Sequence, residues 1–169
     1  TQLEDHKIPM PGWEHLQRSS VYILRTDGTG LKRLSDGMEA AGSPQWSRDG
    51  KQVIFYSLSA DKTFAVRAIG IGMAELAPDD VNTQLISVDV ATGARTQYQA
   101  PPGVNVSPQF IGNGRVGYLR KGRGFEAGKL AWSDQTENHV IEAGAAPGDL
   151  RNPSWSSDGK YIVYHKYQS

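Results

Sequence analysis

Residues 44–56 read Pro-Gln-Trp-Ser-Arg-Asp-Gly-Lys-Gln-Val-Ile-Phe-Tyr, and the pattern returns in residues 153–164 as Pro-Ser-Trp-Ser-Ser-Asp-Gly-Lys-Tyr-Ile-Val-Tyr. A weaker copy, residues 108–118, has phenylalanine in place of tryptophan and Asn-Gly in place of Asp-Gly. Asp-Gly or Asn-Gly between two short β-rich runs is a strong hairpin signal, because these residues tolerate the positive φ of a two-residue turn. Each copy therefore predicts a strand, a tight turn and a second strand.

The composition indicates one turn-rich β domain. The chain has 169 residues, with 19 Gly, 9 Pro and only 21% charged residues, which suits a β protein with a sizeable core. Eighteen basic and eighteen acidic residues give a net charge of zero, so no overall field favours nucleic acid or an anionic membrane. Cysteine is absent, which excludes disulfides, thiolate zinc sites and a cysteine nucleophile. No apolar run approaches the roughly 18 residues that span a bilayer.

The spacing of the copies selects an architecture. Plain hairpins are predicted at 21–34, 84–98 and 129–141, and they alternate with the repeat copies. Once residues 58–83 are discounted as an insertion, the copies recur about every 40 to 50 residues, as the four-stranded blades of a propeller do. We therefore expect one all-β domain over residues 1–169, a partial β-propeller of four-stranded antiparallel blades. Residues 1–20 are polar and irregular and are expected to form an N-terminal arm.

The repeat resembles that of TolB-type (WD40-like) β-propellers. The motif Pro-x-Trp-Ser-x-Asp-Gly-Lys is met at residues 44–51 and 153–160, and the middle copy departs from it at Phe110, Ile111 and Asn113. The resemblance implies structural roles, with the aromatic residue packed between blades and Asp-Gly in the turn. Trp46, Phe110 and Trp155 are therefore expected at equivalent buried positions. The full set of expected repeat residues is Pro44, Trp46, Asp49, Gly50, Pro108, Phe110, Pro153, Trp155, Asp158 and Gly159.

The leading functional hypothesis is a non-enzymatic binding module or scaffold. In a propeller, residues 1–20 and 58–83 would lie on the same face of the channel, where loops that carry function usually gather. We expect a protein or a small molecule to bind there, without a cofactor or a metal. The resemblance also implies a periplasmic or secreted protein. The candidate binding residues are Trp13, His15, Arg67, Glu75, Asp79, Asp80 and His165.

Two enzymatic alternatives stay open. The first is a metal-dependent, carbohydrate-active propeller, either a lyase or a hydrolase, since propeller lyases related to this repeat place several histidines over the channel. The four histidines of this chain are scattered in sequence, and only His165 ends a repeat strand. The second is the propeller portion of a larger peptidase or hydrolase. Metal analysis of the purified protein separates the binding module from the metal-dependent enzyme.

The order of the hairpins predicts open ends. The hairpin at 21–34 corresponds to the third and fourth strands of a blade, and the last repeat corresponds to a first and second strand. Propellers typically contain about four to eight blades, and three blade equivalents leave sheet edges exposed. We expect either a homodimer that completes the ring or a longer chain that supplies the missing blades.

Overall fold

The computed structural model describes residues 19–37, 39–59, 82–121, 128–141 and 149–167. All regular structure in these ranges is β-strand. The described ranges contain no helix that is long and apolar enough to cross a membrane. The predicted all-β class is therefore correct.

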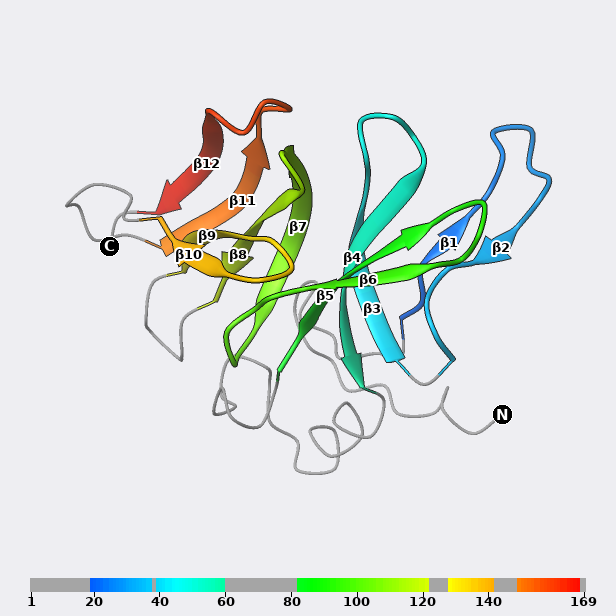
Figure 1. Ribbon diagram of the computed structural model, residues 1–169, viewed down its shortest axis with the longest axis horizontal. Coiled ribbons are helices and arrows are strands. Elements are labelled where there is room, and N and C mark those ends of the chain that lie inside the picture. Colours follow the sequence, from blue (N-terminus) through cyan, green and yellow to red (C-terminus); the bar gives the residue numbers. More distant parts are fainter. Residues whose placement is uncertain (1–18, 38, 60–81, 122–127, 142–148, 168–169) are drawn as a thin grey trace.

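The strands form four antiparallel sheets that follow one another along the chain (Figure 1). The N-terminal half-blade consists of β1 (Tyr22–Ile23) and β2 (Lys32–Arg33), and the C-terminal half-blade consists of β11 (Asp149–Trp155) and β12 (Ile162–Tyr167). Between them lie two complete blades, in which the order in the sheet follows the order in the chain. The first blade contains β3 (Glu39–Trp46), β4 (Gln52–Ser59), β5 (Gln84–Asp89) and β6 (Arg95–Tyr98), and the second contains β7 (Asn105–Gly112), β8 (Arg115–Arg120), β9 (Lys129–Ser133) and β10 (Asn138–Val140).

The first strand of each repeat begins earlier than the sequence predicted. The predicted first strand starts at the proline of each copy, but β3, β7 and β11 begin three to five residues before it. Each strand passes the proline through a β-bulge, and the residue before the proline has a positive φ: 52° at Ser43, 53° at Ser107 and 50° at Asn152. These strands pair on one side only, so a proline at the bulge removes no hydrogen bond from the sheet.

The predicted two-residue turn is confirmed in one copy of the repeat, and the prediction was wrong for the other two. Asn113 and Gly114 have φ values of 52° and 71°, as a two-residue hairpin turn requires. In the other two copies only the glycine, Gly50 or Gly159, has a positive φ. A hydroxyl closes these longer turns, because Ser47 Oγ donates to Asp49 Oδ1 at 2.7 Å and accepts from the backbone N–H of Gln52 at 2.9 Å.

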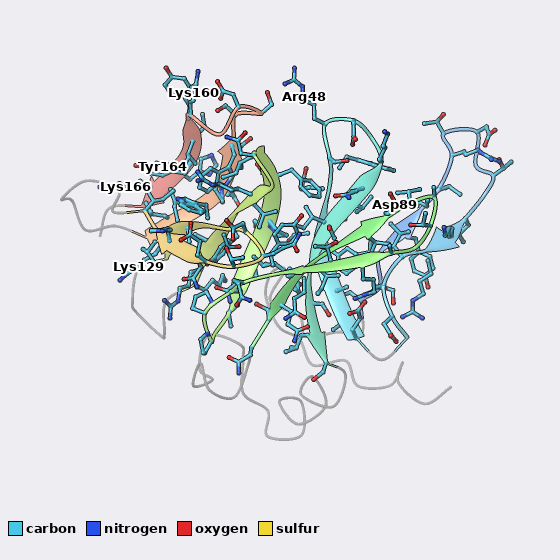
Figure 2. The ribbon with its side chains drawn as sticks, viewed as in Figure 1. Arg48, Asp89, Lys129, Lys160, Tyr164 and Lys166 are labelled. Carbon is cyan, nitrogen blue, oxygen red and sulfur yellow. The ribbon has the colours of Figure 1, made fainter. Side chains whose placement is uncertain are left out.

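The last repeat copy has the same turn. Ser156 Oγ donates to Asp158 Oδ1 at 2.6 Å and accepts from the backbone N–H of Tyr161 at 2.9 Å. These hydroxyl bonds lower the pKa values of Asp49 and Asp158, since they favour the ionised carboxylate. Both turns project from the same end of the molecule, where Figure 2 labels Arg48 and Lys160.

The core lies between consecutive sheets. Val21 and Leu34 of the N-terminal half-blade pack against Val53 and Phe55 of the first blade. β7 packs against β3 and β4, and β11 packs against β7 and β8. Tyr118 of the second blade is fully buried among residues of both blades, and this burial raises its pKa to about 12.

The repeat aromatics do not share one environment. The side chain of Trp155 is 9% exposed and lies on Gly117 of β8, whereas Phe110 is half-buried against the cluster that contains Ile54 of β4. Trp46 is 54% exposed, so the prediction that it is buried was wrong. Trp155 packs on the second strand of the preceding blade, whereas the described N-terminal half-blade contains only strands that correspond to a third and a fourth, so no such strand covers Trp46.

Gly117→Ala is expected to destabilise the fold by about 1 to 3 kcal/mol through overpacking. A Cβ on Gly117 would lie 2.2 Å from Cε2 of Trp155, and the indole is held between two sheets. Urea unfolding monitored by circular dichroism measures the loss. Adding Trp155→Leu to Gly117→Ala serves as the control, because the smaller side chain makes room for the new methyl group. Strictly additive losses in this double variant would contradict the contact.

The boundaries of the two irregular segments are partly described. Leu58 and Ser59 belong to β4, and the buried Thr83 donates its hydroxyl to the carbonyl of Asn105 at 2.8 Å. Ser19 donates its hydroxyl to the carbonyl of Ala41 at 2.8 Å. The ends of the predicted arm (1–20) and insertion (58–83) are thus tied to the blades, while residues 1–18 and 60–81 lie outside the described residues.

Candidate functional site

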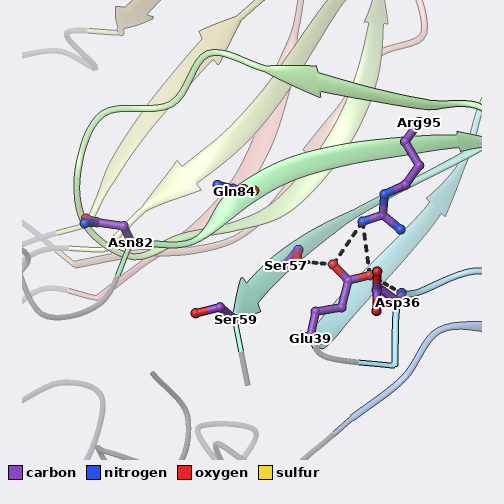
Figure 3. Close-up of a pocket in the computed structure, with 7 residues that line it drawn as sticks. All are labelled: Asp36, Glu39, Ser57, Ser59, Asn82, Gln84 and Arg95. Carbon is purple, nitrogen blue, oxygen red and sulfur yellow. Dashed lines mark hydrogen bonds and ion pairs between the residues drawn. The ribbon is translucent and has the colours of Figure 1, made fainter. Parts of the chain in front are cut away.

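A polar pocket of about 250 Å³ lies at the end of the first blade. At this end β4 stops at Ser59 and β5 begins at Gln84, so the pocket adjoins the points where segment 60–81 leaves and re-enters the blade. Its lining comes from all four strands of the blade and the links beside them (Figure 3). The lining residues all have polar side chains: Asp36, Glu39, Ser57, Ser59, Asn82, Gln84 and Arg95.

Strand pairing places the carboxylate of Glu39 inside the blade. Glu39 is the first residue of β3 and pairs with Ser59, which brings it close to Ser57 on the same neighbouring strand. Ser57 donates its hydroxyl to Oε2 of Glu39, and the backbone N–H of Asp36 donates to Oε1. The side chain of Glu39 is only 9% exposed, so these bonds replace the water it would otherwise bind.

Arg95 neutralises this buried carboxylate. Nη2 of Arg95 lies 3.1 Å from Oε1 and 2.9 Å from Oε2 of Glu39. Nη1 donates to the carbonyl of Leu34 at 3.4 Å, and the guanidinium carbon lies 5.7 Å from the centroid of the Phe55 ring. Charge-assisted bonds of this kind are about twice as strong as neutral ones. Arg95 is therefore committed to Glu39 and does not offer a vacant cation to an anionic ligand.

The hydrogen-bond acceptors of Glu39 are already occupied. Each oxygen of Glu39 already accepts two hydrogen bonds, so the carboxylate is poorly placed to act as a general base or to coordinate a metal. Ser57 has no imidazole beside it among the lining residues, as an activated serine would need. No group of three or more His, Asp or Glu side chains that could hold a metal ion occurs in the described part of the chain.

Two amides complete the site. The side chains of Asn82 and Gln84 are exposed, and Oδ1 of Asn82 accepts the backbone N–H of Gly103 at 2.8 Å. This bond fixes Asn82 at the entrance to β5. An amide donates and accepts hydrogen bonds without carrying charge, so the rim can recognise hydroxyl or amide groups.

Of the sequence-predicted binding residues, the structure describes His165. His165 lies on β12, with Nδ1 3.5 Å from Nδ2 of Asn152, and it is not a lining residue. Trp13, His15, Arg67, Glu75, Asp79 and Asp80 lie outside the described residues.

The sequence analysis missed Glu39, Ser57 and Arg95. Glu39 and Arg95 are 56 residues apart in the chain and belong to no spaced motif. The one available signal was an acidic residue directly before the apolar Ala40-Ala41 pair, and that signal names no partner.

Comparison with known proteins finds the fold but no sequence relative. No family model and no curated protein matches the chain. Among solved structures, it resembles an oligogalacturonate lyase in complex with manganese, with a TM-score of 0.65 and 13% identity over 89% of this chain. An oligogalacturonate lyase from Vibrio parahaemolyticus gives a TM-score of 0.64 and 14% identity over the same share. TolB from Acinetobacter baumannii gives a TM-score of only 0.35 at 12% identity over 88% of this chain and 49% of that one.

The chain spans 42% of the length of each of the two lyases. At 13% and 14% identity the likeness concerns the fold alone. The four consecutive antiparallel sheets and this structural likeness together show a propeller-type fold.

Proposed function

We propose that this chain is part of a propeller-type binding module and that its polar pocket takes an uncharged, hydroxyl- or amide-bearing group. The observation that carries the proposal is the Glu39–Arg95 ion pair, in which the carboxylate is buried and the guanidinium partly exposed, beside the exposed amides of Asn82 and Gln84. The pair supplies fixed polar atoms without net charge, and the amides supply donors and acceptors at the rim. A small molecule or a side chain of a partner protein can carry the group that enters.

The size and charge of the pocket restrict the ligand. Its volume of about 250 Å³ is below the usual range of about 300 to 1,000 Å³ for drug-sized ligands, so one sugar unit or one side chain suits it. The one guanidinium of the described lining is already paired with the carboxylate of Glu39. An anionic sugar would therefore find no vacant cation in this lining, whereas a neutral sugar needs none.

Neutral monosaccharides and small amides are expected to bind saturably, and galacturonate is expected not to bind. Ligand-observed NMR titration measures both. Gln84→Ala should weaken binding by about 2- to 10-fold, the value of one hydrogen bond, without changing the thermal unfolding midpoint. Gln97→Ala is the matched control, because Gln97 is an exposed glutamine on β6 outside the pocket.

Equal binding by the two glutamine variants would place the ligand elsewhere, and binding of galacturonate in preference to neutral sugars would reverse the charge argument. The second result would favour the alternative function, a carbohydrate-active lyase, which the likeness to oligogalacturonate lyases raises. Incubation of the protein with oligogalacturonate and Mn²⁺, followed by ultraviolet absorbance of an unsaturated product, tests that activity directly. We expect no product.

Three further assignments are also proposals. A TolB-type role, a periplasmic or secreted location and membership of a larger hydrolase are suggested by the repeat motif alone. Recognition of a neutral group in the pocket is compatible with the first two and requires no catalytic residue.

A further inference from the structure

The aromatic residue of a first strand lies beside the preceding blade. Trp155 of β11 lies on Gly117 of β8, the second strand of the second blade, and Phe110 of β7 packs against a cluster that joins both complete blades and contains Ile54 of β4. Strand register makes the two receiving positions equivalent, because Gly117 pairs with Gln109 and Ile54 pairs with Gln45 at matching points of the repeat. The Trp155 contact thus joins an aromatic side chain of a first strand to a receiving position on a second strand.

A third receiving position is exposed on the C-terminal half-blade. Val163 pairs with Ser154 at the same point of the repeat, and it is 73% exposed. Burial alternates along β12, since Ile162 and Tyr164 pack against the second blade while Tyr161 and Val163 point away from it. We call Tyr161, Val163 and His165, all exposed, the C-terminal face.

A third first-strand aromatic residue is exposed near the N-terminal half-blade. Trp46 occupies the position of Trp155, and 54% of it is accessible. Ile23 packs against the core of the first blade, whereas its neighbours Tyr22 and Leu24 are exposed. We call Trp46, Tyr22 and Leu24 the N-terminal face.

The strand edges match as well. Among the described strands, β1 pairs only with β2, and β12 pairs only with β11. β1 and β2 correspond to the third and fourth strands of a blade, and β11 and β12 to the first and second. The free edge of β12 is therefore the edge that a third strand would join, and β1 has the free edge of a third strand.

We infer that the N-terminal face of one copy of this chain docks on the C-terminal half-blade of a second copy. Trp46 would lie on Val163 of the C-terminal face and β1 along the free edge of β12, which places Tyr22 and Leu24 on the side of the completed sheet that packs on the second blade. The occupant is a second copy because both halves of the contact are exposed on the same chain. In the described part of the chain, Trp46 has no second strand to pack on, and Val163 has no aromatic side chain over it. Two such contacts in one pair of chains are equivalent, as in an isologous dimer. A net charge of zero sets no overall repulsion against the association.

Sedimentation velocity of the 169-residue protein at micromolar concentration tests the contact. We expect a species of twice the 18.5 kDa chain mass. Trp46→Arg and Val163→Arg should each raise the dissociation constant by at least about 30-fold, as loss of a central interface residue does. Both side chains are exposed in the single chain, so far-UV circular dichroism should stay unchanged. Gln97→Arg, on the outer strand β6, is the control and should leave the dimer intact.

Mixing the two arginine variants distinguishes this contact from general stickiness. Each mixed pair keeps one undamaged contact, formed by the intact faces of the two chains, whereas each variant alone keeps none. The mixture should therefore sediment faster than either variant. A monomeric wild-type chain overturns the inference and assigns the two faces to further blades of a longer polypeptide. Dimers that persist in both variants, or a mixture that behaves like its components, overturn it too.

Discussion

Replacing Trp155 by alanine is expected to lower the free energy of unfolding by about 3 to 5 kcal/mol, the usual cost of removing a packed tryptophan. The same change at Trp46 should cost much less. The two residues stand at the same point of the repeat, but Trp155 is 9% exposed and Trp46 is 54% exposed. Trp155 rests on Gly117, and its backbone N–H donates to Oε1 of Gln109 at 2.9 Å.

Urea unfolding in the Val163→Arg background measures both losses, since that substitution prevents the exposed faces from pairing. Trp155→Phe is the matched control. It keeps a ring on Gly117 and removes the indole N–H, which is buried without a hydrogen-bond partner among the described residues, so most of the stability should return. Equal losses for the two alanine variants would show that the repeat position, and not the neighbouring blade, sets the contribution of the aromatic residue.

Gly159→Ala is expected to cost about 2 to 4 kcal/mol and Gly50→Ala about 1 kcal/mol. Both glycines close an Asp-Gly turn, with φ values of 71° and 69°, so both variants pay the strain of a left-handed residue. A Cβ on Gly159 would also lie 2.4 Å from the carbonyl oxygen of Ile111 in the second blade. A Cβ on Gly50 would have no atom within 4 Å.

Thermal and urea unfolding of the two glycine variants isolate this interblade approach, because the backbone strain cancels in the comparison. A difference of less than about 0.5 kcal/mol, the usual scatter of surface substitutions, would mean that Ile111 moves aside freely. The result bears on the function of the repeat, since it tests whether Asp-Gly acts within its own hairpin or also in the joint between blades.

The hairpins were predictable because their causes are local. Asp-Gly, Asn-Gly and the plain turns stand a few residues from the strands they join, and the recurrence of the motif revealed the order of half-blade, blade, blade and half-blade. A further local signal, an aspartate followed by a threonine in the outer turns, was not used in the prediction. In the outer turns, the backbone N–H groups of Thr29, Thr92 and Thr136 donate to the carboxylates of Asp27, Asp89 and Asp134. The Asp27 and Thr29 pair stood in the sequence.

The sequence alone established the β class, the hairpins and their order along the chain, because turn chemistry and strand alternation act over a few residues. Burial of the repeat aromatics and assembly of the Glu39–Arg95 pocket came from the folded molecule. Trp46 and Trp155 are the same residue in the same motif, yet they differ in exposure because a side chain is covered by whatever sheet lies beside it. Glu39 meets Arg95 only when β3 to β6 pair into one blade, and no short-range pattern records that meeting.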